Sequence, residues 1–390
     1  MIQKLNSKRL LYLRQMLFLL FLMTPFLCLW ALYMAEKSGK YNLYAWWPVL
    51  VYVIILPVVD HLSGRDSVNY TDDQARGAEQ NRYYRILVLL CFPVVIALTV
   101  YGAFIFSTIQ SLNWGGRIGW LFSIALCNAS LVMTAAHELI HKESRLERLI
   151  GSFLLVFACN PGFNVEHIRG HHRHVATPAD TSSAQMGQSF YRFILRAYMG
   201  MNVGPWFIEK RRLNRRGYSA LNWRNELIWL HFLTLVFALA FYLAFGMRGI
   251  IFFIGQGLIT QTAEQMANYT QHYGLKRHKL NENRYERFSP AHAWCCNFIL
   301  SNMLSFQLPR HTDHHIHPRR RYQVLCHTEE SPQMPTGYIG MFLMALIPPL
   351  WFRVMNPRIR AISQDSRSEP PEDEKSTAYR KNKATSDSRP

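Results

Sequence analysis

The stretch IGWLFSIALCNASLVMTAAHELIH, residues 118–141, joins an apolar segment to two closely spaced histidines. Residues 118–136 carry no charged side chain, and a helix needs about 20 apolar residues to cross the hydrocarbon core of a bilayer. His137 and His141 are four residues apart, so on one helix their imidazoles share a face and can reach one metal ion. The stretch therefore predicts a membrane-spanning helix with a metal site at its end.

Several other apolar segments have membrane length. With residues 118–136 they predict an all-α integral membrane fold of about six transmembrane helices. The first has the basic flank of a signal peptide, but its apolar run is too long and no small-residue cleavage site follows, so we expect it to be retained. Two shorter stretches, 149–163 and 338–352, are broken by Pro or Gly and are expected to be re-entrant or interfacial. The remaining spans are expected at 17–35, 43–59, 86–109, 227–245 and 250–263.

The charge is concentrated between the spans. The 43 Lys and Arg residues outnumber the 25 Asp and Glu by 18, whereas the mean hydropathy of −0.04 averages apolar spans over basic polar blocks. The high apolar content excludes a disordered chain. The seven scattered Cys exclude a disulfide scaffold, and the absence of any CxxC pair excludes a zinc ribbon or a fused rubredoxin-type iron site.

The distribution of Lys and Arg predicts the orientation. With the N-terminus inside, nearly all of them fall in the internal blocks 60–85, 137–226 and 264–390, as the positive-inside rule requires. We therefore expect both termini in the cytoplasm of a bacterium, with the protein in its inner membrane. Residues 1–360 are expected to form one domain, with cytoplasmic catalytic parts at 137–226 and 264–335. The polar residues 361–390 are expected to be a disordered tail.

Three histidine clusters and one further histidine lie near the ends of spans, on one predicted side of the membrane. Nine imidazoles exceed the four or so ligands that one Zn²⁺ takes, so the count favours two metal ions. Imidazole suits Fe, Zn or Cu, and iron couples naturally to O₂ chemistry. The candidate ligands are His137, His141, His167, His171, His172, His272, His311, His314 and His315.

Polar residues beside these clusters are candidates for orienting the imidazoles, since a metal-bound histidine donates its second ring N–H to a carboxylate, carbonyl or water. They are Glu138, Glu166, Asn268 and Asp313. The HExxH sequence alone could also belong to a zinc peptidase with Glu138 as the base. That alternative leaves seven of the nine histidines without a role.

The clusters resemble those of the integral-membrane alkane 1-monooxygenase family, within the membrane fatty-acid desaturase and hydroxylase superfamily. The resemblance covers about residues 46–358. It implies that the nine histidines bind a non-haem di-iron centre and that O₂ is used to hydroxylate the terminal methyl group of medium- to long-chain n-alkanes. It also implies electrons from a separate rubredoxin, which is reduced by an NAD(P)H-dependent rubredoxin reductase. The matching motifs are HELIHK (137–142), VEHIRGHHRHVATPAD (165–180), NYTQHYGL (268–275) and LPRHTDHHIHPRRRYQ (308–323).

The sequence departs from the family pattern in four places. Gln271 stands where the family motif has Glu, Gln265 where a further acid is expected, and His174 where Asp is typical. Residues 293–298, AWCCNF, also differ from the usual run. All nine expected ligands are present, so the departures bear on the substrate and on the surroundings of the metals.

An alkane has no polar group, so a pocket among the spans must select it by shape. Large residues of the second expected span, Trp46, Tyr52 and Ile54, are candidates for limiting chain length, although each could instead pack ordinarily against lipid. Related activities stay open: hydroxylation of alkylaromatic or other apolar substrates, or desaturation of acyl chains. A metal transporter or storage protein would need polar residues inside the spans, which are almost free of them.

The excess positive charge could indicate nucleic acid, but its position in cytoplasmic loops is explained by orientation and by anionic lipid. We therefore expect no nucleic-acid partner. Basic residues beside the clusters are candidates for docking an acidic rubredoxin. They are Lys210, Arg211, Arg212, Arg319, Arg320 and Arg321.

Overall fold

The computed structural model describes residues 7–282 and 284–368, and it is almost entirely helical. In chain order the elements of the N-terminal half are α1 (Ser7–Leu17), η2 (Phe18–Met23), α2 (Thr24–Ser38), α3 (Tyr41–Tyr44), α4 (Trp47–Leu50), η3 (Val51–Ile55), α5 (Leu56–Ser63), α6 (Asp72–Gln80), α7 (Arg82–Thr108), α8 (Trp114–Ile140), α9 (Arg145–Phe157), α10 (Phe163–Glu166), η4 (His167–His171) and α11 (His172–His174). Those of the C-terminal half are α12 (Phe190–Asn214), α13 (Glu226–His272), β1 (Lys279–Asn281), β2 (Arg284–Tyr285), η5 (Pro290–His292), α14 (Ile299–Leu304), α15 (His311–Ile316), η6 (Tyr322–Val324), α16 (Tyr338–Ala345) and α17 (Pro348–Ser368).

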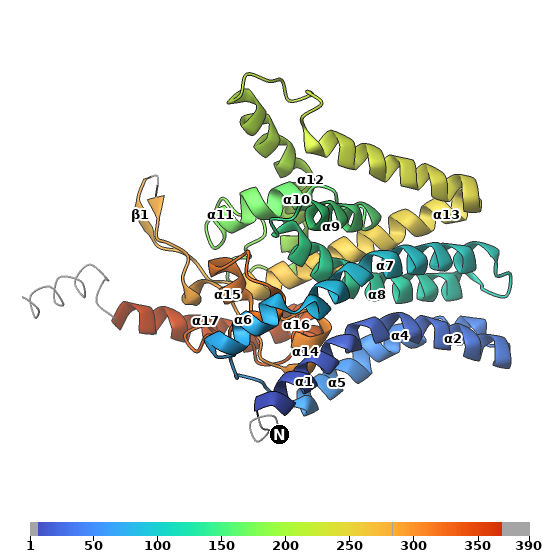
Figure 1. Ribbon diagram of the computed structural model, residues 1–390, viewed down its shortest axis with the longest axis horizontal. Helices are drawn as coiled ribbons and strands as arrows, with labels where there is room; N and C mark the ends of the chain where they lie inside the picture. The colour runs from blue at the N-terminus through green and yellow to red at the C-terminus, as the bar shows by residue number, and fades with distance from the viewer. Residues whose placement is uncertain (1–6, 283, 369–390) are drawn as a thin grey trace, which may run out of the picture.

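Long apolar helices run side by side toward one end of the molecule, and the short elements gather at the other end (Figure 1). Five helical stretches are long and apolar enough to cross a membrane: Tyr12–Ser38, Tyr41–Ser63, Arg82–Thr108, Trp114–Ile140 and Glu226–His272. They cover all six expected spans, of which only 86–109 runs one residue past its helix, so the predicted all-α membrane fold is confirmed.

The last two expected spans lie in one helical element, α13, which is 47 residues long. Gly246 interrupts it with φ of 66° and ψ of −157°, a backbone conformation that glycine adopts without a Cβ penalty. The chain turns back at this point, so the two halves of α13 run in opposite directions (Figure 1). One glycine therefore makes a helical hairpin out of the expected spans 227–245 and 250–263.

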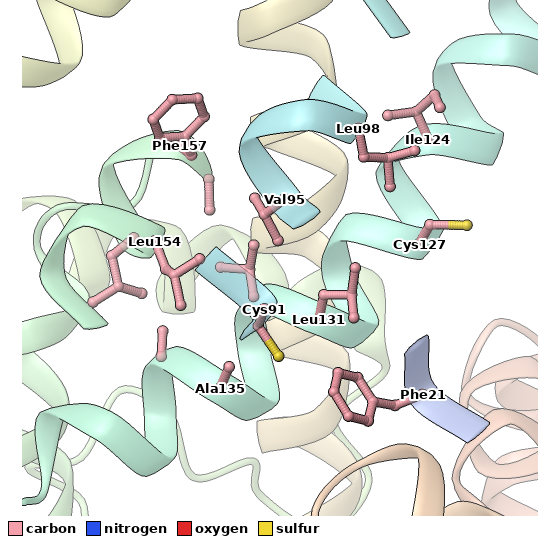
Figure 2. Packing of buried hydrophobic residues seen from close by; sticks show 14 of the residues in the cluster. Phe21, Cys91, Val95, Leu98, Ile124, Cys127, Leu131, Ala135, Leu154 and Phe157 are labelled. Atoms are coloured by element: carbon pink, nitrogen blue, oxygen red, sulfur yellow. The ribbon is translucent and has the colours of Figure 1, made fainter. Parts of the chain in front are cut away.

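The core lies where α7, α8, α9 and the second half of α13 meet. Figure 2 shows Cys91 and Val95 of α7 between Leu131 of α8 and Leu154 of α9, and Leu98 of α7 beside Ile124 of α8. Helices approach closely where glycine faces a neighbour: a Cβ on Gly102 would lie 2.6 Å from the Phe252 ring. Burying an aliphatic side chain of this kind contributes about 1.5–3 kcal/mol, and this packing holds α8, which carries the HExxH motif, against α13.

The expected re-entrant stretch 149–163 consists of the 13-residue helix α9 and a turn that leads into α10. Exposed backbone carbonyls cannot be tolerated at membrane depth unless another group satisfies them. Two amides of α13 do so: Gln256 Nε2 donates to the Phe157 carbonyl over 2.7 Å, and Gln261 Nε2 donates to the Cys159 carbonyl over 2.6 Å. This explains why polar residues occur inside an apolar helix.

The second broken stretch, 338–352, spans the junction of α16 and α17. The two helices are bent by 118° at a short break that precedes Pro348. Helix α17 continues to Ser368, and the rest of the expected tail, residues 369–390, lies outside the described residues. The domain boundary expected at residue 360 therefore stays a prediction.

Candidate metal centre

The nine predicted ligands converge from four parts of the chain into two groups. In each group one nitrogen per histidine lies within 4.8 Å of all the others. The structure thus brings together every histidine that the sequence singled out and divides them five to four, as two ions require. The first group is His137, His141, His167, His172 and His314, and the second is His171, His272, His311 and His315.

The separation of His171 from His172 depends on the π-helical turn η4, His167–His171. In an α-helix His167 would share a face with His171. The wider π turn instead aligns His167 with His172, whose Nε2 atoms are 3.1 Å apart, and directs His171 to the second group. Such turns are frequent at functional sites, and here the turn lets one short segment serve both groups.

The nitrogen separations suit metal ligands. His314 Nε2 lies 3.2 Å from His172 Nε2, and His311 Nε2 lies 3.0 Å from His272 Nε2 and 2.9 Å from His315 Nε2. Nitrogens about 2.1 Å from one ion are about 3 Å apart when they subtend a right angle. The Nε2 atoms of His137, His141 and His171 are buried and have no hydrogen-bond partner among the described residues, so their lone pairs are available.

The environment keeps most imidazoles neutral, which is the state that binds metal. Burial lowers the pKa of His141 to about 3, helped by the neighbouring Lys142 ammonium. Burial and the surrounding imidazoles also lower the pKa values of five further ligands well below the ordinary range, so these do not bind protons at neutral pH. The five are His167, His172, His311, His314 and His315.

Asp180 is a functional residue that the sequence reasoning missed. Its Oδ2 lies 3.0 Å from His171 Nδ1, and both side chains are buried. Burial alone lowers the pKa of His171, but the Asp180 carboxylate outweighs it and raises that pKa overall. The bond orients the His171 ring and leaves Nε2 for a metal. The sequence does contain a signal for this role, because Asp180 is the only acidic residue between Glu166 and Glu209 and so the only carboxylate that follows the second histidine cluster closely.

Glu138 and Asp313 do not contact a ligand ring through any hydrogen bond in the described residues. Glu138 pairs with Lys142 at 2.9 Å and accepts from the Tyr322 backbone N–H. Asp313 binds the Arg320 guanidinium at 2.8 Å and accepts from the Cys326 N–H at 2.9 Å. Both carboxylates therefore hold the 319–326 loop over α8 and α15.

Glu166 and Asn268 lie close to the centre in other roles. Burial, together with the Asp180 charge, raises the pKa of Glu166 to about 8, and its Oε2 has no hydrogen-bond partner. Asn268 Nδ2 donates to Gln265 Oε1 over 3.3 Å, and Gln265 Nε2 donates to Glu264 Oε1 over 3.2 Å. Gln265 therefore contacts an acid, Glu264, one residue before the position where the family pattern has one.

Two further departures from the family pattern, residues 293–298 and Gln271, stabilise α15, the helix that carries three of the predicted ligands. The Cys295 thiol contacts Thr312 Oγ1 at 3.0 Å, and the Trp294 N–H donates to the Gln271 carbonyl over 2.8 Å. The Gln271 side chain donates to the Tyr338 hydroxyl. Residues 293–298 thus connect α15 to the end of α13, where His272 lies.

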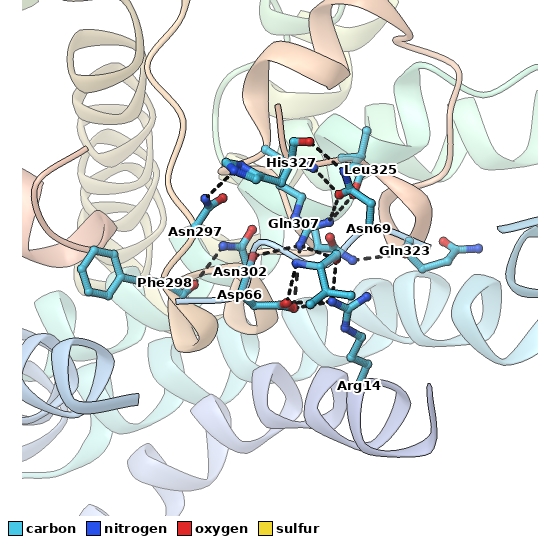
Figure 3. A network of polar contacts seen from close by, with 12 residues as sticks. Arg14, Asp66, Asn69, Asn297, Phe298, Asn302, Gln307, Gln323, Leu325 and His327 are labelled. Atoms are coloured by element: carbon cyan, nitrogen blue, oxygen red, sulfur yellow. Dashed lines mark hydrogen bonds and ion pairs between the residues drawn. The ribbon is translucent and has the colours of Figure 1, made fainter. Parts of the chain in front are cut away.

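A buried ionic network fixes the other side of α15. Arg310, the residue before His311, donates to the carbonyls of Leu325 and Asp66. The Asp66 carboxylate in turn binds Arg14 of α1 at 2.6 Å, and these side chains are at most 4% exposed (Figure 3). The N-terminal helix is thereby joined to the third histidine cluster.

The six basic residues predicted to dock an electron donor differ in whether their charge is already paired inside the protein. Arg212 pairs with Glu209, Arg320 with Asp313 and Arg321 with Glu147, so these three charges serve internal ion pairs. Arg319 is 77% exposed and pairs with Glu143. Lys210 and Arg211 are exposed at the end of α12.

The three residues predicted to limit chain length also have different surroundings. Tyr52 is buried, and its hydroxyl lies 3.1 Å from Ser130 Oγ of α8. Trp46 donates to the Gly115 carbonyl at the opposite end of α8 from the histidines. Ile54 is 58% exposed, so its side chain points outward from the protein. Of the three, Tyr52 therefore lies nearest to the metal centre along α8.

Comparison with known proteins agrees with this geometry. The fatty acid desaturase family model matches residues 112–345. Alkane 1-monooxygenase 2 of Pseudomonas aeruginosa is 44% identical over 81% of this chain and 85% of its own length. Alkane 1-monooxygenase 2 of Alcanivorax borkumensis is 41% identical over 84% and 86%. The hydroxylase component of the Pseudomonas putida xylene/toluene monooxygenase is 30% identical over 70% and 73%.

Proposed function

Because the chain belongs to the alkane 1-monooxygenase family, within the fatty acid desaturase group, we propose that it is a non-haem di-iron enzyme that converts the terminal methyl group of medium- to long-chain n-alkanes to a primary alcohol. O₂ is the oxidant, and a separate rubredoxin, reduced by an NAD(P)H-dependent rubredoxin reductase, supplies the electrons. The division of nine buried or half-buried histidines into two groups of ligand spacing is the observation that carries this proposal.

The protein would hold the metal ligands and the substrate in position and exclude water from the site. Two iron ions, when bound, supply the oxygen activation that an unreactive C–H bond needs. His171, held by Asp180, and the paired i,i+4 ligands on α8 and α15 fix the geometry before substrate arrives. Precise placement matters because a displacement of about 1 Å can cost about a hundredfold in rate.

The substrate would lie along α8. Ser130 and His137 are seven residues apart and share a helical face, and a rise of 1.5 Å per residue separates them by about 10 Å. Tyr52, bonded to Ser130, would limit how far a chain extends from the metals. Trp46 contacts α8 near Gly119, about 27 Å from His137 by the same rise, and would limit only much longer chains.

Substitution of Tyr52 by Ala should shift the preferred chain length upward, and Ile54→Ala should leave it unchanged because Ile54 faces outward. The measurement is product distribution over a panel from octane to hexadecane. An unchanged preference in Tyr52→Ala would remove Tyr52 from the pocket.

The basic test of the function is iron analysis of the purified chain together with product analysis in a rubredoxin system. We expect two iron ions per chain and 1-alcohols from n-alkanes. An alkylaromatic belongs in the panel, since the 30% identical relative is named for xylene and toluene. Alkene without alcohol would indicate a desaturase, and bound metal without O₂ consumption would indicate storage or transport.

We also place the metal centre on the cytoplasmic side of a bacterial inner membrane. The segments that contain the histidines, residues 137–226 and 264–390, also contain most of the Lys and Arg residues, as the positive-inside rule requires of cytoplasmic segments. Thiol labelling of single-cysteine variants at the Gly39 and Gly246 turns, from outside intact cells, tests this orientation.

A further inference from the structure

A basic β-hairpin projects from the end of the molecule at which the histidine-bearing elements gather (Figure 1). Five cationic residues and only two acidic ones lie between positions 276 and 287. Four of the cationic side chains are exposed, and none of these four has an ion-pair partner in the part of the chain that the structure describes. We call them the hairpin cations: Lys276, Lys279, Arg284 and Arg287.

Of the two acidic residues in this segment, Glu282 is exposed and forms no ion pair among the described residues, and Glu286 is already engaged. Glu286 lies 2.9 Å from His292 Nε2 and accepts from the His278 N–H at 2.6 Å. Its contacts brace the base of the hairpin, so the hairpin cations stay available to an external partner.

The hairpin leads directly to the second histidine group. Phe288, which follows Arg287, is half-buried, and its ring centroid lies 4.9 Å from that of His315. His315 Nε2 is 2.9 Å from His311 Nε2 within the group. The other phenylalanine in ring contact with a predicted ligand, Phe163, is buried. Phe288 therefore joins the protein surface to a ligand by one ring contact.

The hairpin cations differ in this respect from the basic residues beside the clusters. Arg212, Arg320 and Arg321 are neutralised by internal carboxylates, whereas the hairpin cations are not. Unpaired exposed charge steers an oppositely charged protein and speeds its association.

We propose that the hairpin cations form the docking surface for a small acidic one-electron carrier protein, and that Phe288 lies on the route of the electrons to the second histidine group. This inference rests on the proposed function. Hydroxylation follows RH + O₂ + 2 e⁻ + 2 H⁺ → ROH + H₂O, so two one-electron carriers are oxidised for each alcohol formed.

The docking surface is tested by binding, which does not depend on turnover. The probe is an acidic bacterial rubredoxin, titrated onto the full chain in nanodiscs at low and high salt. The Lys279→Glu/Arg284→Glu/Arg287→Glu variant should bind at least about tenfold more weakly at low salt, and the difference should shrink as salt screens the charges. Lys37→Glu/Lys40→Glu is the control, because it reverses exposed charges beside the Gly39 turn, and it should bind normally. Lys210→Glu/Arg211→Glu tests the rival docking residues on α12 and should weaken binding less than the hairpin variant does. Loss of binding in the Lys210/Arg211 variant with normal binding in the hairpin variant would overturn the proposal.

The electron route through Phe288 is tested at a rubredoxin concentration that saturates the docking surface. Phe288→Leu should slow oxidation of pre-reduced rubredoxin while leaving its Kd and the metal content unchanged, and Phe288→Tyr should restore the rate. An unchanged rate in Phe288→Leu would remove Phe288 from the route.

Alcohol formation with a small chemical reductant is followed in parallel to keep the two proposals distinct. If no alcohol forms with rubredoxin or with the chemical reductant, the proposed function fails. If alcohol forms and the hairpin variant still binds and oxidises rubredoxin normally, the docking proposal fails.

Discussion

The Nε2 atoms of His167 and His172 lie 3.1 Å apart, although the two residues are five positions apart in the chain. A π turn makes this possible and sends His171, the immediate neighbour of His172, to the other group. Adjacent residues therefore belong to different histidine groups, and this relationship determines how substitutions in the segment should act.

Alanine substitution of His171 or of His172 should remove metal from different groups. Each variant is expected to retain about one of two ions, because each group loses one ligand of a set of four or five. Metal analysis should give similar content for both, but the spectra of the retained iron should differ. His61→Ala, which changes an exposed histidine, is the control. Identical spectra would show that the two groups are not independent.

Asp180→Asn should weaken metal binding at the second group. The carboxylate holds His171 Nδ1, and loss of such a partner costs about 10–100-fold in metal affinity or activity. Competitive metal titration measures the change. Asp73→Asn, at an exposed position on α6, should have no effect. Equal affinity in Asp180→Asn and the parent chain would contradict the assigned role.

Breaking the Arg14–Asp66 pair should destabilise the protein by up to about 3–5 kcal/mol, because the buried Asp66 carboxylate then keeps only the Arg310 guanidinium, 3.7 Å away, as an ion-pair partner among the described residues. Arg14→Met should therefore lower the unfolding temperature markedly. Arg76→Met, which breaks the exposed Arg76–Asp73 pair, should cost less than about 1 kcal/mol. Comparable losses in the two variants would show that the network in Figure 3 is not structural.

Gln256→Leu should cost about 1–3 kcal/mol, because it removes the side-chain donor to the Phe157 carbonyl and leaves Asn128 Nδ2 with Thr99 Oγ1 as its remaining acceptor. Stability in detergent against an added denaturant measures the loss. Leu258→Ala changes a half-exposed residue two positions away on the same helix and should cost less. Full stability of Gln256→Leu would mean that water satisfies the α9 carbonyl.

The metal-free protein should lose stability as the pH rises from about 5 to 8. The pKa of Glu166 is about 8 in the folded chain and near 4.5 when unperturbed, so between these values the folded state binds the extra proton. Stability then falls with rising pH, by a few kcal/mol in all. Melting temperatures of the parent chain and Glu166→Gln measure this, and the variant should show a shallower slope. Equal slopes of melting temperature against pH in the two proteins would show that titratable groups other than Glu166 cause the pH dependence.

The sequence predicts the spans well but not their ends. Helix α8 begins four residues before the expected span because Asn113 caps it, its side chain accepting from the Gly116 N–H. Helix α13 continues nine residues beyond Ala263, through Glu264, Gln265 and Asn268, because these polar residues are buried against other parts of the protein. Hydropathy detects neither effect, since a cap is a local hydrogen bond and a buried polar face needs a tertiary partner.

The sequence by itself determined the membrane fold, the nine candidate ligands and the family, because apolar length and the residue types that bind metal are local properties of the chain. Only the tertiary structure decided how the histidines divide, that Asp180 holds His171, and which arginines are already paired. These depend on a π turn and on contacts between segments up to 177 residues apart, the separation of His137 and His314. Such contacts are set by packing of the whole bundle, which spacing along the chain does not encode.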